Sequence, residues 1–162
     1  MKVLGIDPGT AACGYGVVFQ HGNRLRALDH GTWRTAASEA PEARLKTIFD
    51  GVTELLGLHA PEAVALEESF VGADARTALS VGQARGAVLV ACAAEGVPCV
   101  EYAPTRVKHA VCGYGRAEKG QVQRMVQAML GLKAPPTPNH AADALAVAIC
   151  HALAPPLLEL TG

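Results

Sequence analysis

Several features that would assign a protein to a common functional class are scarce or missing in this sequence. Aromatic residues make up only 4% of the 162 residues, and the net charge is −1, which by itself argues weakly against a nucleic-acid partner. None of the five cysteines forms a CxxC pair, so neither a disulfide framework nor a zinc site is indicated. The apolar stretches are too short and too interrupted to span a bilayer, and the first residues lack the apolar segment of a signal peptide. We therefore expect a cytoplasmic protein with reduced thiols and no membrane contact.

What the sequence does have is apolar content suited to a packed core. Half of the residues are hydrophobic, which argues against disorder. Alanine, valine, leucine and glycine dominate, as in proteins whose helices pack tightly on a sheet. The length fits one domain, spanning 1–162, with a sizeable buried core.

Charge is distributed unevenly along the chain. From Glu39 to Glu68 there are seven acidic and two basic residues, whereas from Tyr102 to Lys133 there are six basic residues and one acidic residue. A local basic region can bind phosphate groups even on a near-neutral protein. The alternative is a solvated helix face with no partner, and charge alone does not decide between the two.

The pattern of apolar residues predicts an α/β domain with a mixed sheet. Expected strands span 2–7, 14–20, 24–33, 63–70 and 97–102, with a hairpin loop at 21–23. Expected helices span 41–58, 74–95, 118–130 and 140–153, and another helix start stands at Pro104-Thr105. We write the order as β-β-β-α-β-α-β-α-α. The first three strands suit an antiparallel meander and the later ones parallel strands with helical crossovers, so we expect helices on both faces of the sheet.

Acidic and metal-capable residues stand where these elements begin or end. Asp7 ends the first strand, Glu67 and Glu68 lie near the end of the fourth, and His140 and Asp143 share one face of the last helix. In sheets of this kind, ligands collect beyond the strand ends. Asp7 could instead be only a turn residue, Asp143 could only complement the helix dipole, and His140 could be an ordinary surface or core histidine.

Adjacent strand residues point to opposite faces, so only one of the two glutamates can join Asp7, and periodicity does not choose between them. Asn139 is a good helix N-cap, with Pro138 marking the entry to the helix. Carboxylates with a histidine suggest hard divalent cations, Mg²⁺ with Mn²⁺ accepted. A pair of such ions, about 3.5–4 Å apart, can support phosphodiester hydrolysis.

A set of motifs in this order resembles the RuvC-type Holliday junction resolvases. They are GIDPGT, GYGVV, ALEESF, ALSVGQARG, VKHAVCGYGRAEKGQVQRMV and NHAADALAVAI, and they cover the chain from Lys2 to about His151. The resemblance implies an RNase H-like fold and paired, symmetric, Mg²⁺-dependent nicks in four-way junction DNA, made during recombination and repair. It also implies a homodimer and work beside a branch-migration motor of the RuvA and RuvB type; from the ligand chemistry above we expect two ions in each active site.

The resemblance assigns roles to single residues. Asp7, Glu67 rather than Glu68, and Asp143 match the family's catalytic, metal-binding acids. His140 stands where many members carry Asp and some carry His, so its role as metal ligand or general base stays open. The residues that match DNA-contacting positions are Phe70, Lys108 and Lys119, with Arg76, Gln83 and Arg85 as weaker candidates for phosphate contact.

Two other functions deserve comparison. An actin-like, phosphate-binding ATPase also opens with a strand and a D-x-G-T turn, but it needs two such domains and a second glycine-rich loop, which this chain lacks. A related RNase H-like nuclease that acts on structured RNA is the second, and the GQARG and AEKxQ segments argue against it.

Overall fold

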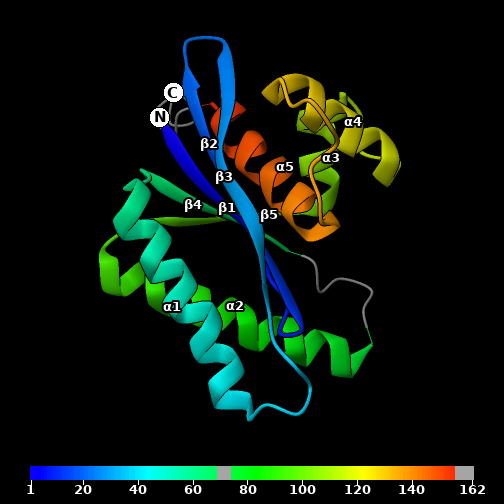
Figure 1. Ribbon diagram of the computed structural model, residues 1–162. Helices are drawn as coiled ribbons and strands as arrows, with labels where there is room; N and C mark the ends of the chain where they lie inside the picture. The colour runs from blue at the N-terminus through cyan, green and yellow to red at the C-terminus, as the bar shows by residue number, and fades with distance from the viewer. Residues whose placement is uncertain (69–73, 156–162) are drawn as a thin grey trace.

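Five strands form one mixed sheet in the computed structural model, which describes residues 1–68 and 74–155 (Figure 1). The strands are β1 (Lys2–Asp7), β2 (Ala12–His21), β3 (Arg24–Arg34), β4 (Ala63–Glu67) and β5 (Cys99–Tyr102), in the sheet order β3-β2-β1-β4-β5. The first three strands pair antiparallel, whereas β4 pairs parallel with both β1 and β5. The predicted hairpin loop is confirmed, because β2 ends at His21 and β3 begins at Arg24. The expected mixed sheet is therefore present.

Helices cover both faces of the sheet, as the sequence predicts (Figure 1). They are α1 (Pro41–His59), α2 (Ala75–Glu95), α3 (Pro104–Cys112), α4 (Lys119–Leu130) and α5 (Asn139–Leu153). One layer consists of α1 and α2, and the other has α5 against the sheet with α3 and α4 behind it. The predicted order was wrong in one respect, because three helices follow β5 rather than two. The helix that starts at Pro104 has nine residues, and Gly113 ends it in the left-handed conformation.

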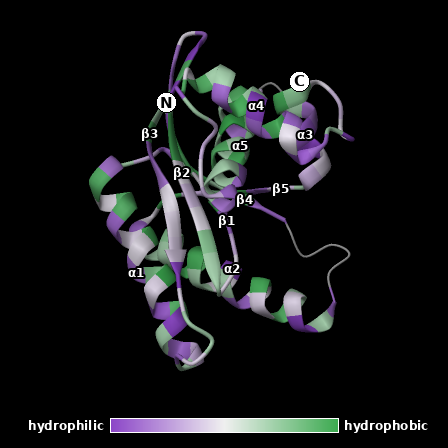
Figure 2. Ribbon diagram, turned by 45° about the vertical axis from the view of Figure 1, so that its right-hand side comes forward, coloured by the Kyte–Doolittle hydropathy of each residue, from purple (hydrophilic) through white to green (hydrophobic). Residues whose placement is uncertain are grey.

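Alternation along β1 divides the apolar side chains between two cores. Leu4 and Ile6 are buried against α1 and α2, and Val3 is buried in the core under α5. Because successive strand residues point to opposite faces, Gly5 and Asp7 lie on the α5 side with Val3. Purple and green residues alternate along α1, as expected for a helix with one face on the sheet and one in solvent (Figure 2).

The α2 helix differs from the sequence prediction in one property. By length and composition its 21 residues could cross a membrane, although we expected no stretch of that kind. Core helices can pass the same test, and Ala84, Val88 and Ala91 of α2 are buried in the core shared with α1 and the sheet. The helix begins after Asp74, whose side chain accepts a hydrogen bond of 2.8 Å from the backbone N–H of Thr77.

Small residues allow α5 to lie directly on the central strands. A Cβ atom at Gly5 would overlap the carbonyl oxygen of Ala144, and one at Gly14 would overlap the backbone of His140. Only glycine leaves room for a helix backbone at these distances. The position of the first turn of α5 is therefore set by the absence of side chains on β1 and β2.

We predict that Gly5→Ala lowers the free energy of unfolding by about 1–3 kcal/mol, the range typical of overpacked cores. The added methyl group would have to displace the backbone of α5, because it meets main-chain rather than flexible side-chain atoms. Chemical denaturation measures the effect. The matched control is Gly57→Ala in the exposed part of α1, where a Cβ meets nothing within 4 Å, and it should gain roughly 0.5–1 kcal/mol. Equal stability of the two variants would contradict the close packing of α5.

Candidate active site

Two carboxylates lie at one edge of the sheet because β1 and β4 are parallel. Asp7 ends β1 and Glu67 ends β4, with Ile6 paired to Leu66 in the preceding register position. In β4, Val64 and Leu66 belong to the core under α1 and α2, whereas Ala65 belongs to the core under α5. Glu67 therefore shares the α5 face with Asp7. Glu67, and not Glu68, thus lies on the face of the sheet that Asp7 occupies.

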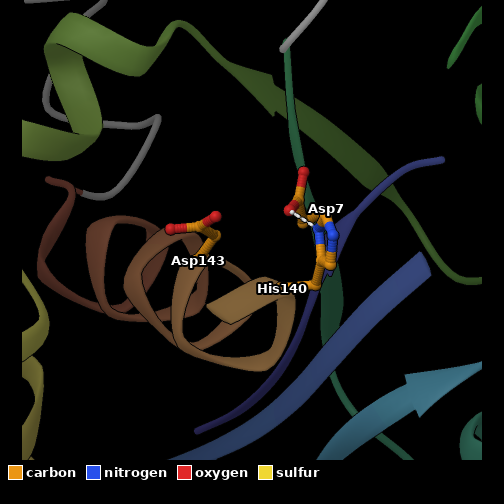
Figure 3. Close-up of side chains that lie close together, drawn as sticks. All are labelled: Asp7, His140 and Asp143. Atoms are coloured by element: carbon orange, nitrogen blue, oxygen red, sulfur yellow. Dashed lines mark hydrogen bonds and ion pairs between the residues drawn. The ribbon is translucent and has the colours of Figure 1, made fainter. Parts of the chain in front are cut away.

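The first turn of α5 brings two more candidate ligands to Asp7. Figure 3 shows His140 and Asp143 beside Asp7, with a hydrogen bond of 3.1 Å between Nδ1 of His140 and Oδ2 of Asp7. One ligand atom from each of the three residues lies within 4.8 Å of the other two. Residues that are 133 positions apart in the chain thus meet at one point.

The start of α5 differs from the prediction in its capping. We expected Asn139 as the N-cap, but the helix begins at Asn139 and Pro138 occupies the cap position with no side-chain hydrogen bond. The Asn139 side chain instead accepts a hydrogen bond of 3.0 Å from Nε2 of Gln123 in α4. A contact between two helices has replaced the local contact that the residue type favours.

These residues fit a hard divalent cation. They line a cavity of about 430 Å³ in which Asp7, Glu67, His140 and Asp143 supply the charged and ligating groups. Carboxylate oxygens with one imidazole nitrogen match the ligand preference of Mg²⁺ and Mn²⁺. Asp7 is only 7% exposed, and a carboxylate this buried needs a cation or hydrogen-bond donors to offset its lost hydration. Glu67 stands next to the three-residue cluster as a fourth candidate.

Burial and mutual repulsion raise the pKa values of two acids in this cavity. Burial, reinforced by the charges of Asp7 and Asp143, raises the pKa of Glu67 to about 8. Burial and the charge of Asp7 also raise the pKa of Asp143. The hydrogen bond to Asp7 raises the pKa of His140 above its ordinary 6.5, against the opposing effect of burial. A bound cation would offset the same repulsion, so the cluster is better suited to the metal-bound state than to the metal-free one.

Both predicted lysines lie beside the acids. Lys108 and Lys119 line a smaller cavity of about 160 Å³ together with Glu67 and Asp143, so the two acids border both cavities. The Nζ atom of Lys119 lies 3.6 Å from Oδ2 of Asp143. Lys119 is exposed and Lys108 is half-buried. Ammonium groups next to a cation site are well placed to meet an anionic substrate.

The other predicted DNA contacts are placed differently. Arg76 is exposed in the first turn of α2 and, with Gln83, lines a further cavity on the α1 side of the site. Arg85 forms an ion pair with Glu101, so its guanidinium already has a protein partner. Phe70 lies outside the described residues. Sequence reasoning did not single out Thr10, Thr77 or Ser80, which line the site cavity, because hydroxyl residues in turns and helices carry no distinctive spacing.

Comparison with known proteins identifies the family. A profile for the crossover junction endodeoxyribonuclease RuvC matches residues 3–151. The chain is 55% identical over 152 residues to a protein of that name from Moorella thermoacetica, which covers 94% of this chain and 91% of the relative.

Solved structures agree with the sequence match. The structure of Thermus thermophilus RuvC in complex with a Holliday junction substrate superposes with a TM-score of 0.89 at 44% identity, covering 94% of this chain and 93% of that one. The yeast mitochondrial Holliday junction resolvase Ydc2, at 13% identity, has a TM-score of 0.65 over 91% of this chain and 77% of its own, and shares the fold. The predicted RNase H-like architecture is confirmed, and the chain belongs to the RuvC family of crossover junction endodeoxyribonucleases.

Proposed function

We propose that this protein is an endonuclease that resolves four-way DNA junctions by hydrolysing phosphodiester bonds at the Asp7 cavity. The observation that carries the proposal is the convergence of Asp7, His140 and Asp143 within 4.8 Å at the sheet edge, in a chain of the RuvC family. A cluster of one buried and two half-buried carboxylates has no evident structural benefit, whereas a nuclease needs such a cluster to hold cations. The RNA-directed nuclease and the actin-like ATPase are not favoured by the family match.

Each residue has a proposed role. Asp7, Glu67 and Asp143 hold Mg²⁺, two ions in each site, with Mn²⁺ accepted. When bound, these ions supply the Lewis acidity and charge neutralisation that phosphodiester hydrolysis requires. His140 reaches the same position through one ring nitrogen, as a ligand or as the group that takes a proton from the attacking water. Hydrolysis leaves a 5′-phosphate and a 3′-hydroxyl, ends that a ligase can rejoin.

Lys108 and Lys119 are proposed to contact phosphates next to the cleaved bond. Both line the cavity on the Glu67 and Asp143 side, and a bound cation would release Lys119 from Asp143. Phe70, by its motif, belongs to the same proposal as an aromatic that stacks on bases at the opened junction. Arg76 joins it as an exposed cation near the site cavity.

Two symmetric nicks need two active sites, so we propose a two-fold homodimer. An apolar groove of about 490 Å³ between α1 and α2 supports this, with Phe49, Ala87 and Val90 in its lining. Val90 is 60% exposed in the single chain. Gly82 and Gly86 of α2 would meet no described atom within 4 Å if they carried a Cβ, so close contact at these glycines, if made, is with a second copy. A branch-migration motor of the RuvA and RuvB type, a cytoplasmic location and a single domain belong to the same proposal.

The assignment of the acids is tested by isosteric amides. Asp7→Asn, Glu67→Gln and Asp143→Asn should each lower the rate of four-way junction cleavage at least about a hundredfold, because each removes a charge that holds the cation. Junction binding, measured by gel shift in Ca²⁺, should stay within a few fold of the wild type. Glu68→Gln is the matched control and should retain substantial activity. Cleavage by Asp7→Asn at the wild-type rate would contradict the assignment of the acids. A wild type that cleaves linear duplex or RNA in preference to the four-way junction would contradict the proposed function.

The raised pKa of Glu67 gives a second, independent prediction on the metal-free protein. A carboxyl with its pKa raised in the folded state binds its proton more tightly there, so the wild type should lose stability as pH rises from 4.5 through about 8. Glu67→Gln cannot ionise and escapes this loss. In EDTA at pH 9 it should melt a few degrees above the wild type, since roughly 1 kcal/mol corresponds to about 2–4 °C in chains of this size. The difference should vanish near pH 4.5 and should be absent in Glu68→Gln. A pH-independent difference would contradict the buried-carboxylate account.

His140 should set the acid limb of the cleavage rate. Its pKa lies above the ordinary 6.5 in the metal-free site, and a protonated imidazole cannot ligate a cation or accept a proton. The cleavage rate should therefore fall as pH drops through the pKa of His140. His140→Asp should stay active, prefer Mg²⁺ over Mn²⁺ more than the wild type does, and retain activity to lower pH, because nitrogen ligands favour transition metals. His140→Ala should be badly impaired. Normal cleavage by the alanine variant with both metals would make His140 a bystander.

A further inference from the structure

A second cavity of about 470 Å³ adjoins the catalytic one on the side away from the lysines. It lies between the N-terminal parts of α1 and α2. Four residues, Thr10, Ala11, Thr77 and Ser80, line both cavities, so a strand that occupies the site can continue into this one. None of the four candidate metal ligands lines this second cavity, so metal binding gives the cavity no role.

Arg44 is held in this cavity by a specific chain of hydrogen bonds. It lies one turn before the buried Ile48, on the side of α1 that faces the sheet, and is itself half-buried. Its Nε donates a hydrogen bond of 2.9 Å to the Thr35 hydroxyl, which in turn donates to the backbone carbonyl of Thr10. Thr10 also exchanges a side-chain hydrogen bond with Ser80 of α2. The guanidinium is thus anchored to the loop that follows Asp7.

The anchored guanidinium keeps most of its donors free. Arginine has five N–H donors, and among the described residues only the one on Nε of Arg44 is used by a protein acceptor. No carboxylate in the described chain lies within ion-pair distance of Arg44. Arg76 lines the same cavity from α2, and none of the residues lining it is acidic. Two cations that share a cavity repel each other, and a bound anion would offset that repulsion.

The chemistry of the cavity favours a phosphate over a base. A planar guanidinium fork binds phosphate oxygens in a bidentate manner. Threonine and serine hydroxyls add neutral donors, and the lining offers no aromatic ring on which a base could stack. A continuous strand places its next phosphate beside the one being hydrolysed, which is where this cavity lies.

We propose that Arg44, with Arg76 opposite it, binds a phosphodiester of the cleaved strand adjacent to the scissile group. The proposal rests on the junction-cleaving function argued above and adds a contact on α1. Arg44 holds the strand in register with the Asp7 cavity and does not touch the reacting atoms. Its loss should therefore weaken junction binding more than it lowers the rate at saturating DNA.

The first test is the salt dependence of junction binding, measured in Ca²⁺ by fluorescence anisotropy. Arg44→Met should weaken binding about tenfold, as expected when a charge-assisted hydrogen bond is lost. It should also flatten the slope of log affinity against log salt by about 0.7–0.9. Arg24→Met is the matched control, because Arg24 is exposed at the hairpin, at the far end of β2 from the site, and should leave the slope unchanged.

Thr35→Val separates phosphate binding from a purely structural role of Arg44. It removes the acceptor of Nε but keeps the guanidinium and its charge. If Arg44 only braced the loop, Thr35→Val and Arg44→Met would have equal effects, and the proposal would fall. If Arg44 binds phosphate, Thr35→Val keeps the wild-type slope. Should Arg44→Met melt too early for use, Arg44→Lys keeps the charge without the fork and should bind several-fold more weakly at an unchanged slope; undiminished affinity would count against the proposal.

A scan of the substrate locates the contact. Single neutral methylphosphonates are placed at each phosphate around the cleavage point, and binding to wild type and Arg44→Met is compared. We expect one position next to the scissile phosphate to weaken wild-type binding while leaving Arg44→Met unaffected. Identical profiles for the two proteins would overturn the inference. A wild type that does not distinguish the four-way junction from linear duplex would instead overturn the proposed function, so the two failures are distinguishable.

Discussion

The close approach of α5 to the two central strands is the constraint on which the site depends. Gly5 and Gly14 have no side chains where the α5 backbone passes, and Gly16 makes room for Leu145. On the helix side, the small side chains of Ala144 and Ala148 allow the helix to approach the strands closely. Helices on sheets ordinarily stand off by the width of larger side chains. Here the helix start lies close enough for His140 to hydrogen-bond directly to Asp7.

The same packing brings charges together at a cost to the metal-free protein. Asp7, Glu67 and Asp143 come from three elements that are each well anchored in a core, so repulsion cannot push them apart by a small shift of a loop. Burial, with this repulsion added, raises the pKa of Glu67 to about 8, so proton uptake by Glu67 is the alternative way to relieve the repulsion. A cation relieves the repulsion without a proton. Stability is thus sacrificed at this edge for a preorganised ligand set, a common pattern in functional sites.

Much of this arrangement could be predicted from the sequence because the deciding signals are local. The hairpin at His21 and the strand that ends in Asp7 follow from residue types and alternation. The placement of His140 and Asp143 on one helix face follows from their three-residue spacing. The family resemblance then joined these residues into one site, which alternation alone could not do. The resemblance also chose Glu67 over Glu68, where periodicity could not, and the burial of Ala65 in the core under α5 places Glu67 on the same face as Asp7.

What could not be predicted depends on contacts between elements. Asn139 has the residue type of a cap, yet its side chain bonds to Gln123 because α4 lies within reach. Arg85 reads as a free cation in the sequence and is neutralised by Glu101 of β5. Arg44 reads as one charge on an amphipathic helix. Its link to Thr35 becomes visible only when the end of β3 and the start of α1 meet the loop after Asp7.

The distribution of cations around the acids gives the site a direction. Lys108 and Lys119 border Glu67 and Asp143 on one side, whereas Arg44 and Arg76 line the cavity on the other. A single phosphate bound at the acids would need only one of these two pairs of cations. A strand that crosses the edge of the sheet carries a charge at every nucleotide and meets cations before and after the acidic cavity. Because the acids repel phosphate unless cations occupy them, binding of the strand and binding of the metal should favour each other. Under the proposed function, the flanking basic groups would hold the strand, and the acids would accept a phosphate only with cations bound to them.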